Sequence, residues 1–273
     1  MSLRRQHVPW KEAGKATEQK PSADDVVRST GWVFNNKRGA ELTLAEFVWS
    51  GDGETVPYLE VFGLNEGIDQ QTIVEIGSGI GRMTAGFTRM FRKVVACDLD
   101  AAFLERCRET VAQYGRPEAL QTSHVADGRT LSLPDATGDL VLSYITFQHC
   151  HHDDAIALTR EALRVAKPGG HIALNYRTWV PMDALLWPAG KIVRGLWRLP
   201  KIGPRLATQR LATRLGWQAN RIAPPEVLAV LGDRVESVKL YRNPRRRPFK
   251  LGVDEGTYVG VHPSHWWVIA RVK

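Results

Sequence analysis

The amino-acid sequence predicts an α/β protein with a mostly parallel sheet, and two observations support this fold class. Short, β-branched runs such as Ile73–Ile76 alternate with segments of helical periodicity such as Ala101–Tyr114, which is the order of βαβ units. Near the end of the chain, Val235–Arg242 and His265–Val272 are predicted to close the sheet as an antiparallel pair. A length of 273 residues, of which 43% are hydrophobic, is enough for one such domain with extensions.

The segment before the first strand is predicted to be less regular. Residues 1–28 are polar and lack hydrophobic periodicity, so we expect a loosely ordered arm. Ala40–Trp49 has apolar residues at helical intervals, and Ser50–Gly53 is a predicted helix stop. A second helix is predicted over Val56–Phe62.

The first predicted strand leads directly into a glycine-rich loop. Gly77–Gly81 has the spacing G-x-G-x-G, and glycines let the backbone turn tightly and approach a ligand closely. After the predicted helix Met83–Phe91, a second strand over Lys93–Cys97 ends on Asp98. An acid in this position is placed to accept hydrogen bonds from a ribose diol, so the segment is predicted to bind a nucleotide.

The glycine loop does not match a dinucleotide fingerprint, because Arg82 stands where G-x-G-x-x-G needs its third glycine. The run Glu75–Gly81 instead resembles motif I of the class I S-adenosylmethionine-dependent methyltransferases. Three later segments resemble the elements that follow in this family, in the same order: Val125–Gly128, Asp139–Tyr144 and Arg164–Gly170. The resemblance covers about residues 70–177.

This resemblance implies a Rossmann-like, seven-stranded, mostly parallel sheet with an antiparallel last strand pair. Residues 70–273 would form the methyltransferase domain, and residues 1–69 an N-terminal arm and cofactor-covering helices. The implied cofactor is S-adenosyl-L-methionine, with S-adenosyl-L-homocysteine as product. In the family, the acid equivalent to Asp127 accepts from the adenine amino group. The cofactor-binding residues implied are Glu75, Gly77, Ser78, Gly79, Arg82, Asp98, Leu99, Asp127, Gly128 and Tyr144.

Histidines follow the fourth predicted strand, at the edge where the carboxyl ends of the strands face the ligand crevice. His149 is the first candidate for a general base, because imidazole titrates near neutral pH. His151 and His152 are the alternatives, and Tyr176 is the reserve candidate for positioning the acceptor. In many relatives a histidine at the position of His149 only packs near the cofactor, so that interpretation stays open.

The run His151–Asp154 also has residue types that bind magnesium, which some sugar-modifying methyltransferases use. However, Asp153 and Asp154 precede a predicted helix, where acids stabilise the N-terminus. We therefore predict no metal site and keep magnesium as the alternative.

The chain has no run of eighteen apolar residues, and charges interrupt residues 1–19 where a signal peptide needs an apolar centre. Its three cysteines, Cys97, Cys107 and Cys150, are odd in number and lack C-x-x-C spacing. We expect a cytoplasmic protein with buried free thiols and neither disulfides nor structural zinc.

An insertion of about residues 178–222 follows the fifth strand and has apolar residues at helical intervals. It contains four tryptophans and eight basic residues, with Asp183 as its only acid. Three interpretations fit this helical cap: a lid with solvated charges, a substrate-binding cap, or a basic amphipathic surface that transiently meets anionic lipid.

The predicted function is methyl transfer to a hydroxyl of a small molecule, such as a sugar or another natural product. The alternatives are N- or C-methylation of a small molecule or lipid-like acceptor, and RNA methylation, which a pI near 9.6 prompts. Nucleic acid is disfavoured, because Ser143–Thr146 lacks the Asn/Asp-Pro-Pro-aromatic motif of enzymes that act on exocyclic base nitrogens. A non-catalytic binding protein is the remaining rival, and the oligomeric state stays open.

Overall fold

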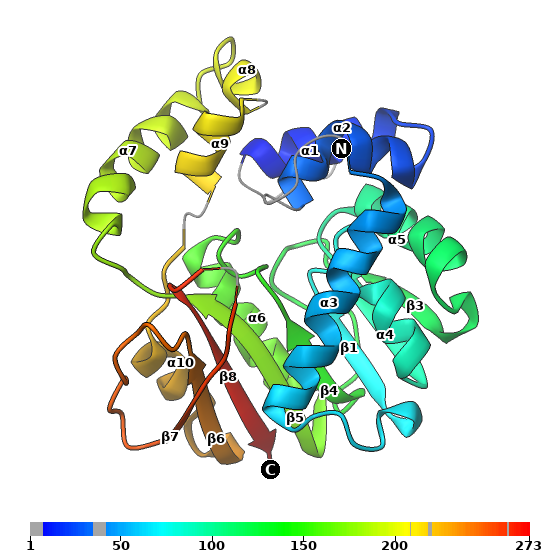
Figure 1. Ribbon diagram of the computed structural model, residues 1–273, viewed down its shortest axis with the longest axis vertical. Helices are drawn as coiled ribbons and strands as arrows, with labels where there is room; N and C mark the ends of the chain where they lie inside the picture. Colours follow the sequence, from blue (N-terminus) through cyan, green and yellow to red (C-terminus); the bar gives the residue numbers. More distant parts are fainter. Residues whose placement is uncertain (1–7, 35–41, 208, 218–219, 261) are drawn as a thin grey trace.

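The computed structural model describes residues 8–34, 42–207, 209–217, 220–260 and 262–273. Its centre is an eight-stranded sheet with the order β3-β2-β1-β4-β5-β8-β6-β7 (Figure 1). The strands are β1 (Thr72–Ile76), β2 (Lys93–Asp98), β3 (Leu120–His124), β4 (Gly138–Ser143), β5 (Ala166–Arg177), β6 (Val235–Arg242), β7 (Asp254–Thr257) and β8 (His265–Val272). Strands β1 to β5 are parallel, whereas β8 runs antiparallel to both β5 and β6.

The predicted Rossmann-like sheet is confirmed, with one strand more than the seven expected. The extra strand is β7, which pairs in parallel with the outer edge of β6. Its sequence, Asp254-Glu255-Gly256-Thr257, has neither β-branched runs nor alternation, so the pairing with β6 defines it rather than a local pattern.

The helices are α1 (Val8–Gln19), α2 (Ala23–Phe34), α3 (Leu44–Phe62), α4 (Thr84–Met90), α5 (Ala101–Tyr114), α6 (His152–Val165), α7 (Asp183–Leu196), α8 (Gly203–Ala207), α9 (Arg210–Trp217) and α10 (Pro224–Leu231), with 3₁₀ turns at Ile68–Gln70, Pro117–Ala119 and Gly232–Arg234. Alternate strand residues face the two sides of the sheet. Val74 packs in the core beneath α6 and α10, and its neighbour Ile73 packs in the core beneath α3 and α4.

The N-terminal segment is not the loosely ordered arm that its composition predicts, because from Val8 onward α1 and α2 are regular helices. A few apolar side chains anchor them: Val26 and Val27 are buried in a cluster with Phe47 of α3 and Phe103 of α5. The apolar positions are too few to show periodicity, so tertiary burial provides the order.

The predicted helix stop at Ser50–Gly53 is also wrong, since α3 runs through it without interruption. The helix begins with a capping box between Thr43 and Glu46. Gly51 does not end the helix but allows a close contact, because a Cβ at this position would lie 2.2 Å from the backbone oxygen of Arg82. The glycine therefore lets α3 lie directly against the end of the glycine loop.

The segment predicted as a helical cap contains α7, α8 and α9. In Figure 1 these helices rise on one side above the carboxyl ends of the parallel strands, and α1 and α2 lie on the other. Helices α1 and α8 contact each other across this end of the molecule. Within the described ranges, no helix has the length and apolar character needed to cross a membrane.

Candidate functional site

The glycine loop between β1 and α4 depends on backbone conformations that favour glycine. Gly77, Gly79 and Gly81 have φ angles of 85°, 56° and 95°. The amides of Gly77 and Ser78 both donate to the carbonyl oxygen of Cys97, at 2.7 and 3.1 Å. A Cβ on Gly77 would lie 2.2 Å from the side chain of Thr146. The loop is thus held between the end of β2 and the loop that follows β4.

Asp98 lies beside this loop at the end of β2. Its carboxylate accepts from the amides of Gly79 and Asp100, both at 2.9 Å. Burial raises the pKa of Asp98 to about 6, although these amide bonds favour its charged form. The amide bonds therefore do not fully compensate the burial of this charge, and hydrogen bonds from ligand hydroxyls would stabilise it further.

A cavity of about 410 Å³, including space open to solvent, lies at the carboxyl ends of β1 and β2. Four of the residues implied for the cofactor line it: Gly77, Asp98, Leu99 and Gly128. Val125 and Leu158 give the cavity an apolar wall, which suits a flat ring. Asp98 gives it a hydrogen-bond acceptor, which suits a diol. This set of residues fits the adenosine part of S-adenosylmethionine.

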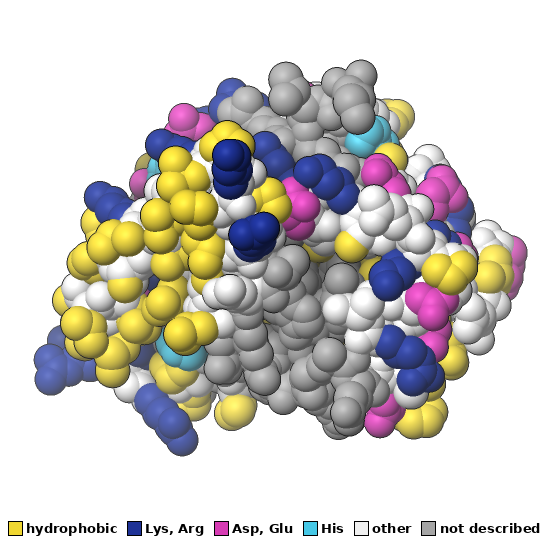
Figure 2. All heavy atoms as spheres, turned by 90° about the horizontal axis from the view of Figure 1, so that it is seen from above, with side chains coloured by type: hydrophobic (Ala, Val, Ile, Leu, Met, Phe, Trp, Pro, Cys, Tyr) yellow, Lys and Arg dark blue, Asp and Glu magenta, His cyan; other side chains and the backbone are white. Residues whose placement is uncertain are grey.

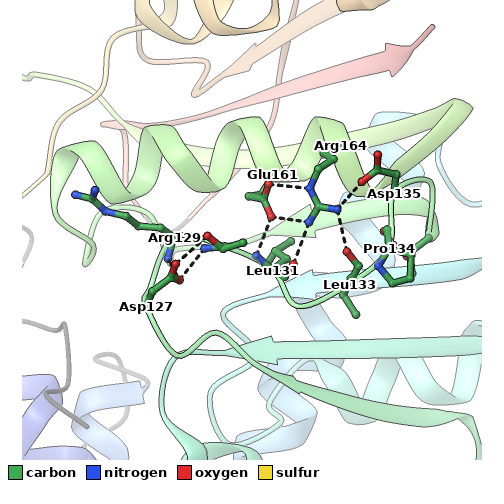
Figure 3. Close-up of polar contacts among 10 residues, drawn as sticks. Asp127, Arg129, Leu131, Leu133, Pro134, Asp135, Glu161 and Arg164 are labelled. Atoms are coloured by element: carbon green, nitrogen blue, oxygen red, sulfur yellow. Dashed lines mark hydrogen bonds and ion pairs between the residues drawn. The ribbon is translucent and has the colours of Figure 1, made fainter.

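The loop after β3, which carries Asp127 and Gly128, is joined to α6 by hydrogen bonds (Figure 3). Arg164 donates to the carbonyl oxygens of Leu131 and Leu133, at 2.9 and 2.8 Å, and pairs with Glu161. Asp127 itself is exposed, and its carboxylate accepts from the amides of Arg129 and Thr130, at 2.8 Å each. Partial burial opposes ionisation, but these bonds outweigh it and lower the pKa of Asp127.

Asp154 is a cavity residue that the sequence analysis interpreted as a helix N-terminal acid, with magnesium binding as the alternative. Its buried carboxylate lines the cavity and accepts from Nε of Arg129 at 2.5 Å. Cys150 and Thr146 line the same cavity without having been predicted as ligand contacts.

Besides Gly79 and Asp127, four residues implied for the cofactor lie outside this cavity lining. Arg82 pairs with Glu54 of α3 at 2.7 Å and lies over the ring of Tyr144, 5.9 Å from its centroid. The hydroxyls of Tyr144 and Tyr58 are 3.0 Å apart beneath α3. Arg82 and Tyr144 therefore join the glycine loop to α3.

Glu75 and Ser78 are the other two, and both are buried. Thr84 donates to Glu75 at 2.6 Å, and burial raises the pKa of Glu75 to about 7. The hydroxyl of Ser78 has no hydrogen-bond partner among the described residues. The implied side-chain contacts of this pair with the cofactor stay predictions.

The loop after β4 contains a strained residue. Ile145 has a φ of 58°, which is rare for a β-branched side chain and costs about 1–3 kcal/mol. Its amide donates to Oδ1 of Asn175 on β5 at 3.3 Å, and the next residue, Thr146, packs against Gly77. Tertiary contacts thus impose the turn that leads to the histidines.

His149 is fixed on both sides. Its ring centroid is 5.0 Å from that of Trp10 on α1. The amide nitrogen of Gln148 lies 3.3 Å from Nε2 of His149, and the amide oxygen accepts from Nε2 of His265 at 3.2 Å. Because an amide nitrogen can only donate, Nε2 of His149 is the acceptor in this relay. Burial lowers the pKa of His265 to about 3, so His265 stays neutral.

The other acid–base candidates point elsewhere. His152 is exposed and its Nε2 bonds to Glu226 of α10 at 3.0 Å, while His151 is exposed at the start of α6. The hydroxyl of Tyr176 lies 2.7 Å from that of Thr159 within the core, and burial raises the pKa of Tyr176. None of the four candidates, His149 included, is among the residues that line the cavity; His149 lies between two that are, Thr146 and Cys150.

A buried ion cluster at the end of β5 was missed by the sequence analysis. Asp183, the only acid of the cap, accepts from Arg221 at 2.7 Å and from Arg177 at 3.2 Å. The one available signal was an isolated acid in a basic segment, together with an arginine that ends an apolar strand.

Among the residues that the structure describes, no group of three or more His, Cys, Asp or Glu side chains is arranged to hold a metal ion. Cys97, Cys107 and Cys150 are free thiols, and burial raises the pKa of each to about 12. They therefore stay protonated and pack as small apolar side chains.

Comparison with known proteins agrees with this geometry. Residues 74–174 match the methyltransferase domain family. The carboxy-S-adenosyl-L-methionine synthase of Pseudomonas fluorescens is 31% identical over 108 residues, which cover 38% of this chain and 44% of that protein. The chain thus matches less than half the length of this relative.

Two solved structures resemble the whole chain. Magnesium protoporphyrin IX methyltransferase from Synechocystis, with bound S-adenosylhomocysteine, has a TM-score of 0.56 at 14% identity and covers 92% of this chain and 98% of its own. A S-adenosylmethionine-dependent methyltransferase from Thermotoga maritima has a TM-score of 0.52 at 14% identity, covering 97% and 100%. At these identities the likeness shows the fold.

Proposed function

We propose that this chain, whose residues 74–174 form a class I S-adenosylmethionine-dependent methyltransferase domain, methylates a hydroxyl of a small molecule such as a sugar or another natural product. The cavity lined by Gly77 and Asp98 carries this proposal, because it lies beside the loop that holds His149. The acceptor would enter between this loop and the cap.

Each part of the cofactor has a candidate partner in the chain. Asp98 accepts from the ribose hydroxyls, Leu99 and Val125 cover the adenine ring, and Asp127 accepts from its amino group. The glycine loop lets the cofactor approach the backbone closely. When bound, S-adenosylmethionine supplies an electrophilic methyl group on a positively charged sulfur.

His149 is the proposed general base that takes the proton of the acceptor hydroxyl. The proton would go to Nε2, the ring nitrogen that carries none, and the hydrogen bond from the Gln148 amide to Nε2 would break in that step. The contact with Trp10 and the relay through Gln148 to His265 support this choice, since they orient the imidazole. Orientation of the acceptor supplies most of the acceleration, and a positioned base adds roughly 10²–10⁴-fold.

Calorimetric titration with S-adenosylhomocysteine tests the cofactor assignment. We expect binding that weakens about 10–100-fold in Asp98→Ala, because hydrogen bonds to a charged acceptor are lost. A folded protein that binds neither S-adenosylmethionine nor S-adenosylhomocysteine would refute the proposal.

A screen with methyl-labelled S-adenosylmethionine and a panel of hydroxyl, amine and thiol acceptors then tests the reaction. With an acceptor in hand, His149→Ala should lower kcat by roughly 10²–10⁴-fold, and His152→Ala should change it less than about threefold. If the labelled product carries an N- or C-methyl group, the hydroxyl assignment is wrong. Label transfer to RNA would select that alternative, and a cytoplasmic location stays a prediction.

One observation favours a second candidate, a lipid-like acceptor presented at an anionic membrane surface. Apolar side chains gather over the cap, on the left in Figure 2, with Lys and Arg beside them. Leu185, Ile192 and Met182 are 72%, 67% and 59% exposed, and Lys191 and Lys201 are also exposed. Such a mixture is typical of interfacial helices.

Vesicle co-sedimentation distinguishes this candidate. The protein should bind vesicles containing phosphatidylglycerol but not pure phosphatidylcholine, and the double substitution Leu185→Ser with Ile192→Ser should abolish binding. Equal binding to both vesicles, or none to either, would contradict it.

A further inference from the structure

We propose that Arg177, supported by Arg221, forms a buried oxyanion subsite that holds a carboxylate or phosphate of the acceptor. This inference rests on the proposed function, since it places a charged group on the molecule that becomes methylated. It assigns a binding role to residues outside every motif of the sequence.

The first argument is charge. The side chains of Arg177 and Arg221 are 4% and 7% exposed, and that of Asp183 is fully buried. Asp183 accepts from Nη2 and Nε of Arg221, from Nη2 of Arg177 and from the amide of Val180. Two guanidinium groups and one carboxylate leave one positive charge in excess.

Among the described residues, the charged groups that act on Arg177 are Arg221 and Asp183. Burial and the charge of Arg221 lower the pKa of Arg177 to about 10, so Arg177 stays charged at neutral pH. Burial and the charge of Arg177 lower the pKa values of His262 and His265, so both rings are mainly neutral there. A buried charge without a counter-charge is expensive, and a negatively charged ligand would supply the missing partner.

The second argument is unpaired hydrogen-bonding capacity. Nε and Nη1 of Arg177 are buried and have no hydrogen-bond partner within the described part of the chain. Buried donors are rarely left unpaired in native proteins. Nε and Nη1 lie on different edges of the guanidinium, and each shares its edge with Nη2, one hydrogen of which already goes to Asp183. The second hydrogen of Nη2 together with Nε or Nη1 can bind the two oxygens of a carboxylate or phosphate.

The third argument is position. Arg177 pairs with His265 across β5 and β8, and Nδ1 of His265 is also buried with no partner among the residues that the structure describes. This nitrogen can accept a hydrogen bond from a hydroxyl group of the same ligand, such as the hydroxyl of a phosphate monoanion. Gln148 is hydrogen-bonded to both His265 and His149, so this one side chain connects the subsite to the proposed base.

The anion belongs to the acceptor rather than to the cofactor. The cofactor cavity is lined from β1, β2, the loops after β3 and β4, and α6, and none of its lining residues is on β5. Arg177 ends β5, which is one strand beyond β4, and the cap that holds Asp183 and Arg221 follows it directly.

The test uses the full chain saturated with S-adenosylhomocysteine and titrated calorimetrically with inorganic phosphate and, separately, with acetate. We expect one of these anions to bind, and the stronger of the two indicates the acceptor group. Arg177→Met should weaken this binding at least about tenfold, and Arg177→Lys should weaken it less, because the charge remains. The control Arg247→Met removes an exposed arginine and should leave it unchanged.

Melting temperature gives a second readout. Arg177→Met leaves Asp183 and Arg221 as a neutral pair, so the variant without ligand should melt at the same or a higher temperature than the parent. A loss as large as that of Asp183→Asn would make Arg177 a structural counter-ion and overturn the inference.

Failure of the two proposals is distinguishable. If S-adenosylhomocysteine does not bind the parent, the methyltransferase proposal fails. If it binds but neither anion does, or if Arg177→Met binds anions like the parent, only the subsite is wrong. If Arg177→Met instead weakens S-adenosylhomocysteine itself about tenfold or more, the anion is the cofactor's own carboxylate and the acceptor subsite is likewise wrong.

Discussion

The two ends of the sheet use different means to present polar groups. On the cofactor side, at the ends of β1 and β2, the groups are largely backbone amides and the carboxylate of Asp98, and they come from a short run, residues 76 to 100. On the side that we propose for the acceptor, at β5 and β8, they are side chains from positions far apart in the chain: Gln148, Arg177, Asp183, Arg221 and His265.

This difference indicates how strongly substitutions should affect ligand binding on each side. Backbone amides cannot be altered by most substitutions, so the cofactor side tolerates sequence change outside its glycines and acids. The acceptor side depends on buried side-chain charges, and there a single substitution changes both stability and the ligand that fits.

The largest effect should come from removing the central acid of the acceptor side. Asp183→Asn leaves two buried arginines without a counter-charge, and we expect a loss of about 3–5 kcal/mol in the free energy of unfolding. Urea denaturation measures it, with Asp233→Asn, an exposed acid, as the control. A loss no greater than that of the control would show that the cluster is not stabilising.

A paired glycine substitution in α3 probes the cofactor side. Gly51→Ala would force a Cβ against the carbonyl oxygen of Arg82, and it should cost about 1–3 kcal/mol of stability and weaken S-adenosylhomocysteine binding. Gly53→Ala, in the same helix with open space around it, should stabilise the protein by about 0.5–1 kcal/mol. Equal effects of the two alanines would disprove the contact argument.

The pH dependence of cofactor affinity probes a single carboxylate. The pKa of Asp98 is raised to about 6, so below that pH the protonated acid loses an acceptor. Affinity for S-adenosylhomocysteine should therefore rise from about pH 5 to 7 by up to about tenfold and then level off. Asp98→Asn should bind more weakly and without this dependence, and calorimetry at several pH values decides the matter.

The smallest effect is expected at the surface pair between α6 and α10. Bonds to Asp153 and Glu226 outweigh partial burial and raise the pKa of His152, so the pair stabilises most at low pH and loses its contribution as pH rises through that raised value. Because the pair is exposed, His152→Ala should cost less than about 1 kcal/mol at pH 6 and nothing at pH 9. Thermal melting at both pH values measures it, and an equal loss at both would exclude the ion pair.

Prediction from the sequence succeeded where the signal is local. Periodicity placed β6, β8 and α5 at their observed bounds, and the glycine spacing located the loop beside the cavity. It failed for α3, where Gly51 looks like a helix stop and only the neighbouring Arg82 explains it.

The ion cluster had almost no local signal. Arg177 and Arg221 are 44 positions apart, and neither differs in type from the solvated arginines around it. Only folding shows that these two are buried beside one carboxylate, so the proposed anion subsite was beyond sequence reasoning.

Helix α1 contacts both the cofactor side and the proposed acceptor side of the molecule. Trp10 lies 6.3 Å from Phe103 of α5 and 5.0 Å from His149, measured between ring centroids, and α1 also packs against α8 of the cap. A molecule that enters beside His149 therefore meets the same helix that rests on the cofactor-binding half. We predict that α1 couples the two binding equilibria, and linkage then requires that occupancy of either site change affinity at the other by the same factor. Acceptor and cofactor should bind cooperatively, and deleting α1 should uncouple them.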